Sequence, residues 1–152
     1  MTLPKIAVTM GDPAGIGPEI CLRLLQDEEI ARICTPVIFG SISVLEQTAD
    51  QCRLDKPEKV LAGLSEVDSP CVLDIGAIGS NDFTTGTINA ATGQASFSYI
   101  EDAINAALSG QISAVTTAPI NKEALHTAGI PFPGHTEIFA AKTHAPRSCM
   151  LQ

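Results

Sequence analysis

The stretch MGDPAGIGPE, residues 10–19, decides the fold because it joins a strand pattern to a helix pattern. Residues 5–10 (KIAVTM), which lead into it, are rich enough in β-branched and apolar side chains to predict a strand. Residues 19–26 (EICLRLLQ), which follow it, repeat apolar side chains at helical spacing, and Pro18 suits the first turn of a helix. The stretch is therefore predicted to be the turn between a first strand and a first helix.

The alternation of strand and helix patterns continues along the chain. Further strands are predicted at residues 36–40 (PVIFG), 71–75 (CVLDI) and 112–117 (ISAVTT, expected to be buried), with the start of another at 148–151 (SCML). Further helices are predicted from a cap at Ser41 to about Cys52, over 92–108, from near Asn121 to Gly129, and over 135–143. This order predicts an α/β fold with a doubly wound, mostly parallel sheet and right-handed crossovers.

The remaining segments have weaker patterns. Residues 54–70 are polar and predict short edge strands or loops. Residues 76–93 are rich in Gly, Asn, Thr and Ser and are long for a compact loop, which points to a functional or flexible segment. The helix over 92–108 has the clearest apolar face, and Gly110 is placed to end it. That face is expected to consist of Ala95, Ile100, Ala103, Ile104, Ala107 and Leu108.

The composition argues against several kinds of partner. The chain has 152 residues, about one domain's worth, and a net charge of −8 without a cluster of Lys or Arg, so a nucleic-acid-binding surface is not expected. No run of about 18 apolar residues occurs, so no membrane-spanning helix is expected. The five cysteines form no C-x-x-C and no secretory pattern precedes Lys5, which predicts reduced thiols in a cytoplasmic protein.

The turn itself has two interpretations. Glycines at positions 11, 15 and 17 allow the backbone to approach a ligand closely, and the helix that follows offers free N–H groups to an anion. The stretch lacks both the Lys-Ser/Thr of a P-loop and the G-x-G-x-x-G order of a dinucleotide fingerprint. A purely structural strand-to-helix turn is an equally good interpretation. Asp12 is accordingly either a carboxylate that stabilises the helix end or a ligand contact.

A second motif, TTAPINKEAL at residues 116–125, follows the predicted strand 112–117. In open α/β sheets, ligands bind beyond the carboxyl ends of the strands. Asn121 can cap the next helix, which places Lys122 in its first turn. A lysine there is electrostatically unfavourable by about 0.3–1 kcal/mol, which suggests that it reaches a phosphate or carboxylate. An ordinary exposed lysine is the alternative.

A third motif, PFPGHTEIF at residues 131–139, places a rigid Pro/Gly loop before a helix. His135 and Thr136 are expected at the helix N-terminus, with Thr136 as a possible cap and Glu137 favourable in the first turn. His135 could donate to an anionic substrate or act as an acid or base, and an ordinary surface histidine is the alternative. The three histidines show no metal-ligand spacing.

Together, the segments MGDPAGIGPE, TAPINKEAL and GHTE resemble the 4-hydroxythreonine-4-phosphate dehydrogenase (PdxA) family in order and spacing. YIEDAINAAL, which precedes ISAVTTAPINK, is also similar to the family. The resemblance implies two α/β/α domains similar to those of the isocitrate and isopropylmalate dehydrogenases, with the active site between the domains of a homodimer's subunits. Residues 1–118 would then form the N-terminal portion of the first domain, and residues 119–152 the start of the second.

The resemblance also implies an activity. An NAD- or NADP-dependent enzyme, aided by a divalent metal ion (Zn, Mg or Co), would oxidise 4-phosphooxy-L-threonine to the 3-keto acid. That acid would lose CO2 to give 3-amino-2-oxopropyl phosphate, on the route to pyridoxal phosphate. In the family the His-Thr of the GHTE motif contacts the substrate, which implies this role for His135 and Thr136. We assign Lys122 to a substrate or cofactor phosphate and name Asp12 as a further candidate for substrate contact.

The family places its metal-binding histidines and most of its dinucleotide contacts downstream of the GHTE motif. Residue 152 lies only fifteen positions after Glu137, so we expect the chain to be an inactive fragment of a longer protein. No catalytic, cofactor-binding or metal-binding residue is assigned within it. Two alternatives stay open. A family paralogue could oxidise threonate or erythronate 4-phosphate, or an aromatic cis-dihydrodiol, and a non-enzymatic chain could only bind an anion at the Gly-rich turn.

Overall fold

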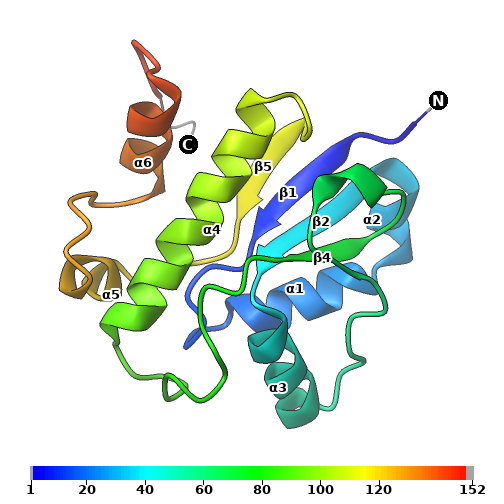
Figure 1. The fold of residues 1–152 in the computed structure, drawn as a ribbon, viewed down its shortest axis with the longest axis horizontal. Coiled ribbons are helices and arrows are strands. Elements are labelled where there is room, and N and C mark those ends of the chain that lie inside the picture. Colours follow the sequence, from blue (N-terminus) through cyan, green and yellow to red (C-terminus); the bar gives the residue numbers. More distant parts are fainter. Residues whose placement is uncertain (1, 150–152) are drawn as a thin grey trace.

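Four of the predicted strands and a short edge strand from the segment 54–70 form one sheet, in which every pair of neighbouring strands is parallel, in the order β3-β4-β2-β1-β5 (Figure 1). The computed structural model describes residues 2–149. The strands are β1 (Lys5–Thr9), β2 (Thr35–Gly40), β3 (Val60–Leu61), β4 (Cys71–Asp74) and β5 (Ala114–Thr117). The helices are α1 (Gly17–Leu25), α2 (Glu28–Ile33), α3 (Ile42–Cys52), the short 3-10 helix η1 (Leu64–Glu66), α4 (Ala90–Leu108), α5 (Lys122–Thr127) and α6 (His135–Thr143).

Helices cover both faces of the sheet, as the doubly wound prediction requires. Helix α4 packs against β1, β2 and β5, whereas α1 and α3 lie together on the other side of the sheet, with α1 against β2 (Figure 1). All six residues of the central strand β2 are buried, because both of its faces are covered. The α/β/α fold class predicted from the sequence is confirmed.

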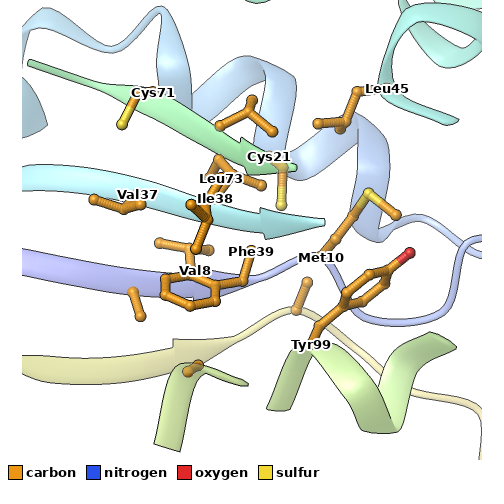
Figure 2. Close-up of a cluster of buried hydrophobic side chains, with 14 of the residues drawn as sticks. Val8, Met10, Cys21, Val37, Ile38, Phe39, Leu45, Cys71, Leu73 and Tyr99 are labelled. Carbon is orange, nitrogen blue, oxygen red and sulfur yellow. The ribbon is translucent and has the colours of Figure 1, made fainter. Parts of the chain in front are cut away.

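The core is built from aliphatic side chains, with few aromatic rings. Val37, Ile38 and Phe39 of β2 lie at its centre and are at most 1% exposed (Figure 2). Tyr99 of α4 and Cys21 of α1 are also fully buried and approach the strands from opposite helix layers (Figure 2). Burial raises the pKa of the Cys21 thiol to about 12, so this free cysteine stays protonated and is a poor nucleophile within the core.

Strand β5 differs from the buried strand that the sequence predicts. Its residues alternate between exposed and half-buried, because within residues 2–149 it pairs only with β1 and lies at the edge of the sheet. The prediction of a strand within residues 112–117 was therefore correct, whereas the prediction that the strand is buried was wrong. Ser148 and Cys149 lie in no strand, and the rest of the strand predicted at 148–151 lies outside the described residues.

Helix α4 starts two residues earlier than predicted, at Ala90, because Asn89 caps it by accepting a hydrogen bond from the Ala91 N–H at 2.6 Å. The predicted apolar face is buried along most of its length, but Leu108 is 62% exposed. Gly110 follows the helix with a φ of +76°, the left-handed conformation expected of a terminating glycine.

Ser41 occupies the N-cap position of α3, but its side chain does not cap the helix. Its hydroxyl lies 2.7 Å from the Tyr99 hydroxyl in the core and accepts from the Ile78 N–H at 3.3 Å. Asp74 replaces it by accepting from the Ile42 N–H at 3.1 Å. The prediction of the helix start was correct, whereas the predicted capping contact was wrong because a buried partner competed for the hydroxyl.

The strand order reverses between β1 and β5, and the site lies beside this reversal. After β1 the chain continues outward through α1 to β2 and β4, and α4 then returns it to the far side of β1 (Figure 1). Connections that leave adjacent strand ends in opposite directions open a crevice, where open α/β sheets bind ligands. The turn after β1 and the segment after β5 are the two sides of this crevice.

Helices α5 and α6 both pack against α4. The division of the chain at residues 118 and 119 stays a prediction. Among residues 2–149, no helix is long and apolar enough to cross a membrane.

Candidate functional site

The Gly-rich turn after β1 is held by close backbone contacts. Gly11 adopts a φ of +73°, and a Cβ there would lie 2.3 Å from the Pro119 carbonyl oxygen, so only glycine fits. The Asp12 N–H donates to the same oxygen at 3.0 Å. The carboxylate of Asp12 accepts from the Ala14 N–H at 2.8 Å, and the residue is only 4% exposed. The turn is therefore fixed against the segment that follows β5.

That segment positions Lys122. The Ala118 N–H donates to the Thr9 carbonyl at 2.9 Å, which continues the pairing of β1 and β5 past the end of the sheet. The Asn121 side chain caps α5 by accepting from the Ala124 N–H at 3.0 Å, as predicted. Lys122 is consequently the first residue of α5.

Helix α6 begins at the predicted residue, His135, but its cap differs from the prediction. Gly134 occupies the N-cap position and no side chain caps the helix, whereas Thr136 lies within the first turn. The proline and glycine residues of the preceding loop leave the chain extended at Gly134, so the cap lies two positions before Thr136. The first-turn N–H groups of a helix lack partners within the helix, which makes this end suitable for an anion.

The structure brings three of the four candidate residues into one place. Lys122, His135 and Thr136 line a hollow of about 270 Å³, together with Ile120, Pro133, Gly134 and Glu137. A neighbouring hollow of about 280 Å³ is lined by the Gly-rich turn, including Asp12, and by residues after β5. Ile120 borders both hollows, so they are adjoining parts of the crevice.

Lys122 forms no ion pair with a carboxylate of the described chain, although Glu137 lines the same hollow. Five of the nine Lys and Arg side chains form ion pairs, but none of the pairs among residues 2–149 includes Lys122. In a chain with a net charge of −8, an unpaired lysine beside a helix N-terminus is a local positive centre. The hollow is therefore suited to bind a phosphate or carboxylate.

His135 has an environment that favours its neutral form. Burial, and then the positive charge of Lys122, lower the pKa of His135 below its ordinary value of 6.5. Its Nε2 atom is buried without a hydrogen-bond partner. A buried polar atom without a partner is energetically unfavourable, and a bound ligand that hydrogen-bonds to it would remove that penalty.

Asp12 lies apart from the other three candidates, in the second hollow. Its buried carboxylate already accepts a backbone hydrogen bond within the turn, which favours the structural interpretation of this residue.

One part of the crevice was not recognised from the sequence. The Gly86 N–H donates to the Ala14 carbonyl at 2.8 Å, and Gly86 and Thr87 line the second hollow beside the Gly-rich turn. The only signal in the sequence was the length and composition of the loop that contains them. In the structure, part of that loop lines one side of the crevice.

Residues 2–149 bring no three His, Cys, Asp or Glu side chains together as a set of metal ligands. The described residues therefore do not by themselves fit a metal centre.

Comparison with known proteins identifies relatives along nearly the whole chain. The family model "Pyridoxal phosphate biosynthetic protein PdxA" matches residues 32–152. The 4-hydroxythreonine-4-phosphate dehydrogenase of Synechocystis sp. is 41% identical over 92% of this chain and 39% of that protein. The D-threonate 4-phosphate dehydrogenase of Cupriavidus necator is 36% identical over 98% of this chain and 46% of its own length. The chain thus spans less than half the length of these curated relatives.

Solved structures agree with this result. A 4-hydroxythreonine-4-phosphate dehydrogenase from Burkholderia phymatum superposes with a TM-score of 0.87 and 35% identity, over 97% of this chain and 46% of that one. A terephthalate 1,2-cis-dihydrodiol dehydrogenase from Burkholderia xenovorans superposes with a TM-score of 0.68 and 30% identity, over 87% and 39%. Its lower score indicates greater structural divergence from the chain described here.

Proposed function

Because this chain belongs to the PdxA family, we propose that it is part of a dehydrogenase that oxidises 4-phosphooxy-L-threonine to the 3-keto acid, which then decarboxylates to 3-amino-2-oxopropyl phosphate. Relatives are named dehydrogenases of phosphorylated hydroxy acids, which supports the general reaction. The activity is proposed for the protein at the full length of its relatives, acting as a cytoplasmic homodimer.

The observation that carries the proposal is the hollow that joins Lys122, His135 and Thr136. An anionic group of the substrate would face the Lys122 ammonium group and the free N–H groups at the start of α6. The Thr136 hydroxyl and the unpartnered Nε2 of His135 can hydrogen-bond to the same ligand. These residues would bind and orient the substrate, and the role that we assign to them is substrate binding.

The reaction also needs groups that these residues do not provide. NAD or NADP would accept the hydride, and a divalent metal ion would lower the pKa of the substrate hydroxyl when bound. We propose that the metal ligands come from the part of the protein outside this chain.

A second substrate is favoured by a specific observation. Relatives named D-threonate 4-phosphate dehydrogenase match with a similar identity, 36% against 41%. That substrate shares the phosphate and the oxidisable hydroxyl but has a hydroxyl where phosphooxythreonine has an amino group. The anion hollow would serve either substrate.

A direct assay tests the proposal. The full-length protein is supplied with NAD or NADP, a divalent metal ion and either substrate, and reduced nucleotide is followed by its absorbance. We expect a higher kcat/KM for 4-phosphooxy-L-threonine than for D-threonate 4-phosphate. The reverse preference would replace the first substrate by the second, and no turnover of either would contradict the proposed dehydrogenase function.

A further inference from the structure

Helix α4 supports both sides of the Lys122–His135 hollow, because the helices that begin with these two residues both pack against it. Helix α5, which begins with Lys122, packs along α4. Helix α6, which begins with His135, is attached farther along α4 (Figure 1). Ile138 of α6 lies in one apolar cluster with Ile100 and Ile104 of α4 and with Leu125 of α5. An ion pair between Lys142 and Glu101 also holds α6 to α4, and it involves no residue of α5. A change between α4 and α5 is therefore expected to move Lys122 more than His135.

Gly93 is the point at which α5 rests on α4. A Cβ atom at Gly93 would lie 2.1 Å from the Ala124 carbonyl oxygen and 2.8 Å from the Leu125 nitrogen. Non-bonded atoms prefer separations of about 3.5–4.0 Å, so a methyl group there would displace the α5 backbone by more than about 1 Å. Ala124 is only two residues after Lys122, in a helix of six residues, so this displacement would reach the lysine.

The glycine is unfavourable for α4 itself. Gly93 lies inside a 19-residue helix, and glycine is a poorer helix former than alanine. Its φ is not in the left-handed region, so the backbone of α4 does not require it. The contact with α5 is the feature that alanine could not preserve.

The same part of α4 also touches the other side of the crevice. The Ser96 hydroxyl lies 3.2 Å from the Gly11 carbonyl oxygen of the Gly-rich turn, although it is closer, at 2.7 Å, to the Thr92 carbonyl within its own helix. The first turns of α4 thus contact both the turn after β1 and the helix after β5.

We propose that Gly93 is a positioning residue of the site. Because Gly93 has no side chain, α5 can pack closely against α4, and this packing sets the position of Lys122 relative to His135. The role of the hollow in substrate binding rests on the proposed function. The packing of α5 against α4 at Gly93 does not depend on that function. A displacement of about 1 Å in a binding group is enough to lower catalytic efficiency by as much as about 100-fold.

The test measures the influence of Lys122 on His135 and requires no activity. The pKa of His135 is determined by NMR titration of its ring in the full-length protein, with and without Lys122→Met. Removing the lysine charge should raise the pKa of His135, because Lys122 lowers it. The pKa of His135 is then measured with and without Lys122→Met in the Gly93→Ala background. We expect the pKa to rise less there, because the lysine has moved. Gln94→Ala, an exposed neighbour on α4, is the control and should leave the rise unchanged.

An equal rise in the wild-type and Gly93→Ala backgrounds would overturn the proposal, whatever the substrate of the protein. If Gly93→Ala does not fold, Ala124→Ser supplies a milder change, since it adds one atom at a fully buried position of α5. A smaller effect of Lys122 on His135 in that background supports the proposal, and an unchanged effect contradicts it.

Discussion

Replacing Gly17 with alanine is expected to lower the free energy of unfolding by about 3 kcal/mol or more, enough to leave much of the chain unfolded. A Cβ at Gly17 would lie 1.9 Å from the Met10 carbonyl oxygen and 3.3 Å from the Ala118 Cβ. Both neighbours are fixed, because the Met10 N–H, directly after β1, donates to the Phe39 carbonyl, and the Ala118 N–H donates to the Thr9 carbonyl. Urea unfolding followed by circular dichroism measures the loss.

Gly15 provides a matched control within the same turn. Its added Cβ would lie 3.5 Å from the nearest atom, the Asp12 carbonyl oxygen, which is ordinary van der Waals contact. Gly15 is exposed and its φ is not in the left-handed region, so Gly15→Ala should change stability by no more than about 0.5 kcal/mol. Equal losses for the Gly15 and Gly17 variants would contradict the account of this turn.

Replacing Lys122 with methionine should lower kcat/KM of the full-length protein by about 100-fold, mainly through a higher KM. The loss corresponds to one hydrogen bond to a charged group, worth about 1.5–3 kcal/mol. Methionine preserves the length and much of the apolar stem of lysine, so the helix start should remain intact. Initial rates at varied substrate concentration separate the effects on KM and kcat.

Lys56→Met is the matched control, because it removes one positive charge from an exposed ion pair with Asp50. Such pairs contribute little, so this variant should keep the wild-type kcat/KM. Equal losses of kcat/KM in both lysine variants would contradict the prediction, because the effect would then reflect net charge. An unchanged kcat/KM in both variants would contradict it as well.

Local patterns were sufficient to predict most of the fold. The strand at Lys5–Thr9, the turn and the helix at Gly17–Leu25 follow from β-branched residues, glycines and a proline whose preferences are largely independent of distant contacts. Helix α6 begins and ends at the predicted residues, His135 and Thr143.

The errors arose where distant residues decide the outcome. Burial of β5 depends on what lies beside it in the sheet, which an apolar run does not reveal. The Ser41 hydroxyl was expected to cap a helix but interacts with Tyr99, 58 positions later in the chain. Local sequence preferences predict where a polar residue lies in an element, whereas its hydrogen-bond partner depends on tertiary packing.

The sequence identified candidate site residues but did not reveal how they are arranged. Lys122, His135 and Thr136 were identified by unfavourable or helix-terminal placement, and the structure brings them to one hollow. Gly93 gave no such signal, because a glycine within a helix pattern is tolerated and its neighbour on α5 lies about thirty residues away. Asp12 was recognised as ambiguous, and its contacts now favour a structural role.

The central claim is that the hollow formed by Lys122, His135 and Thr136 binds an anionic group. The most direct measurement is an NMR titration of the His135 ring with inorganic phosphate at constant pH, with chloride at matched ionic strength as the control. We predict a saturable shift of the His135 signal with phosphate alone, which Lys122→Met abolishes and Lys56→Met preserves. A shift that never saturates, or one that survives Lys122→Met unchanged, would contradict the claim.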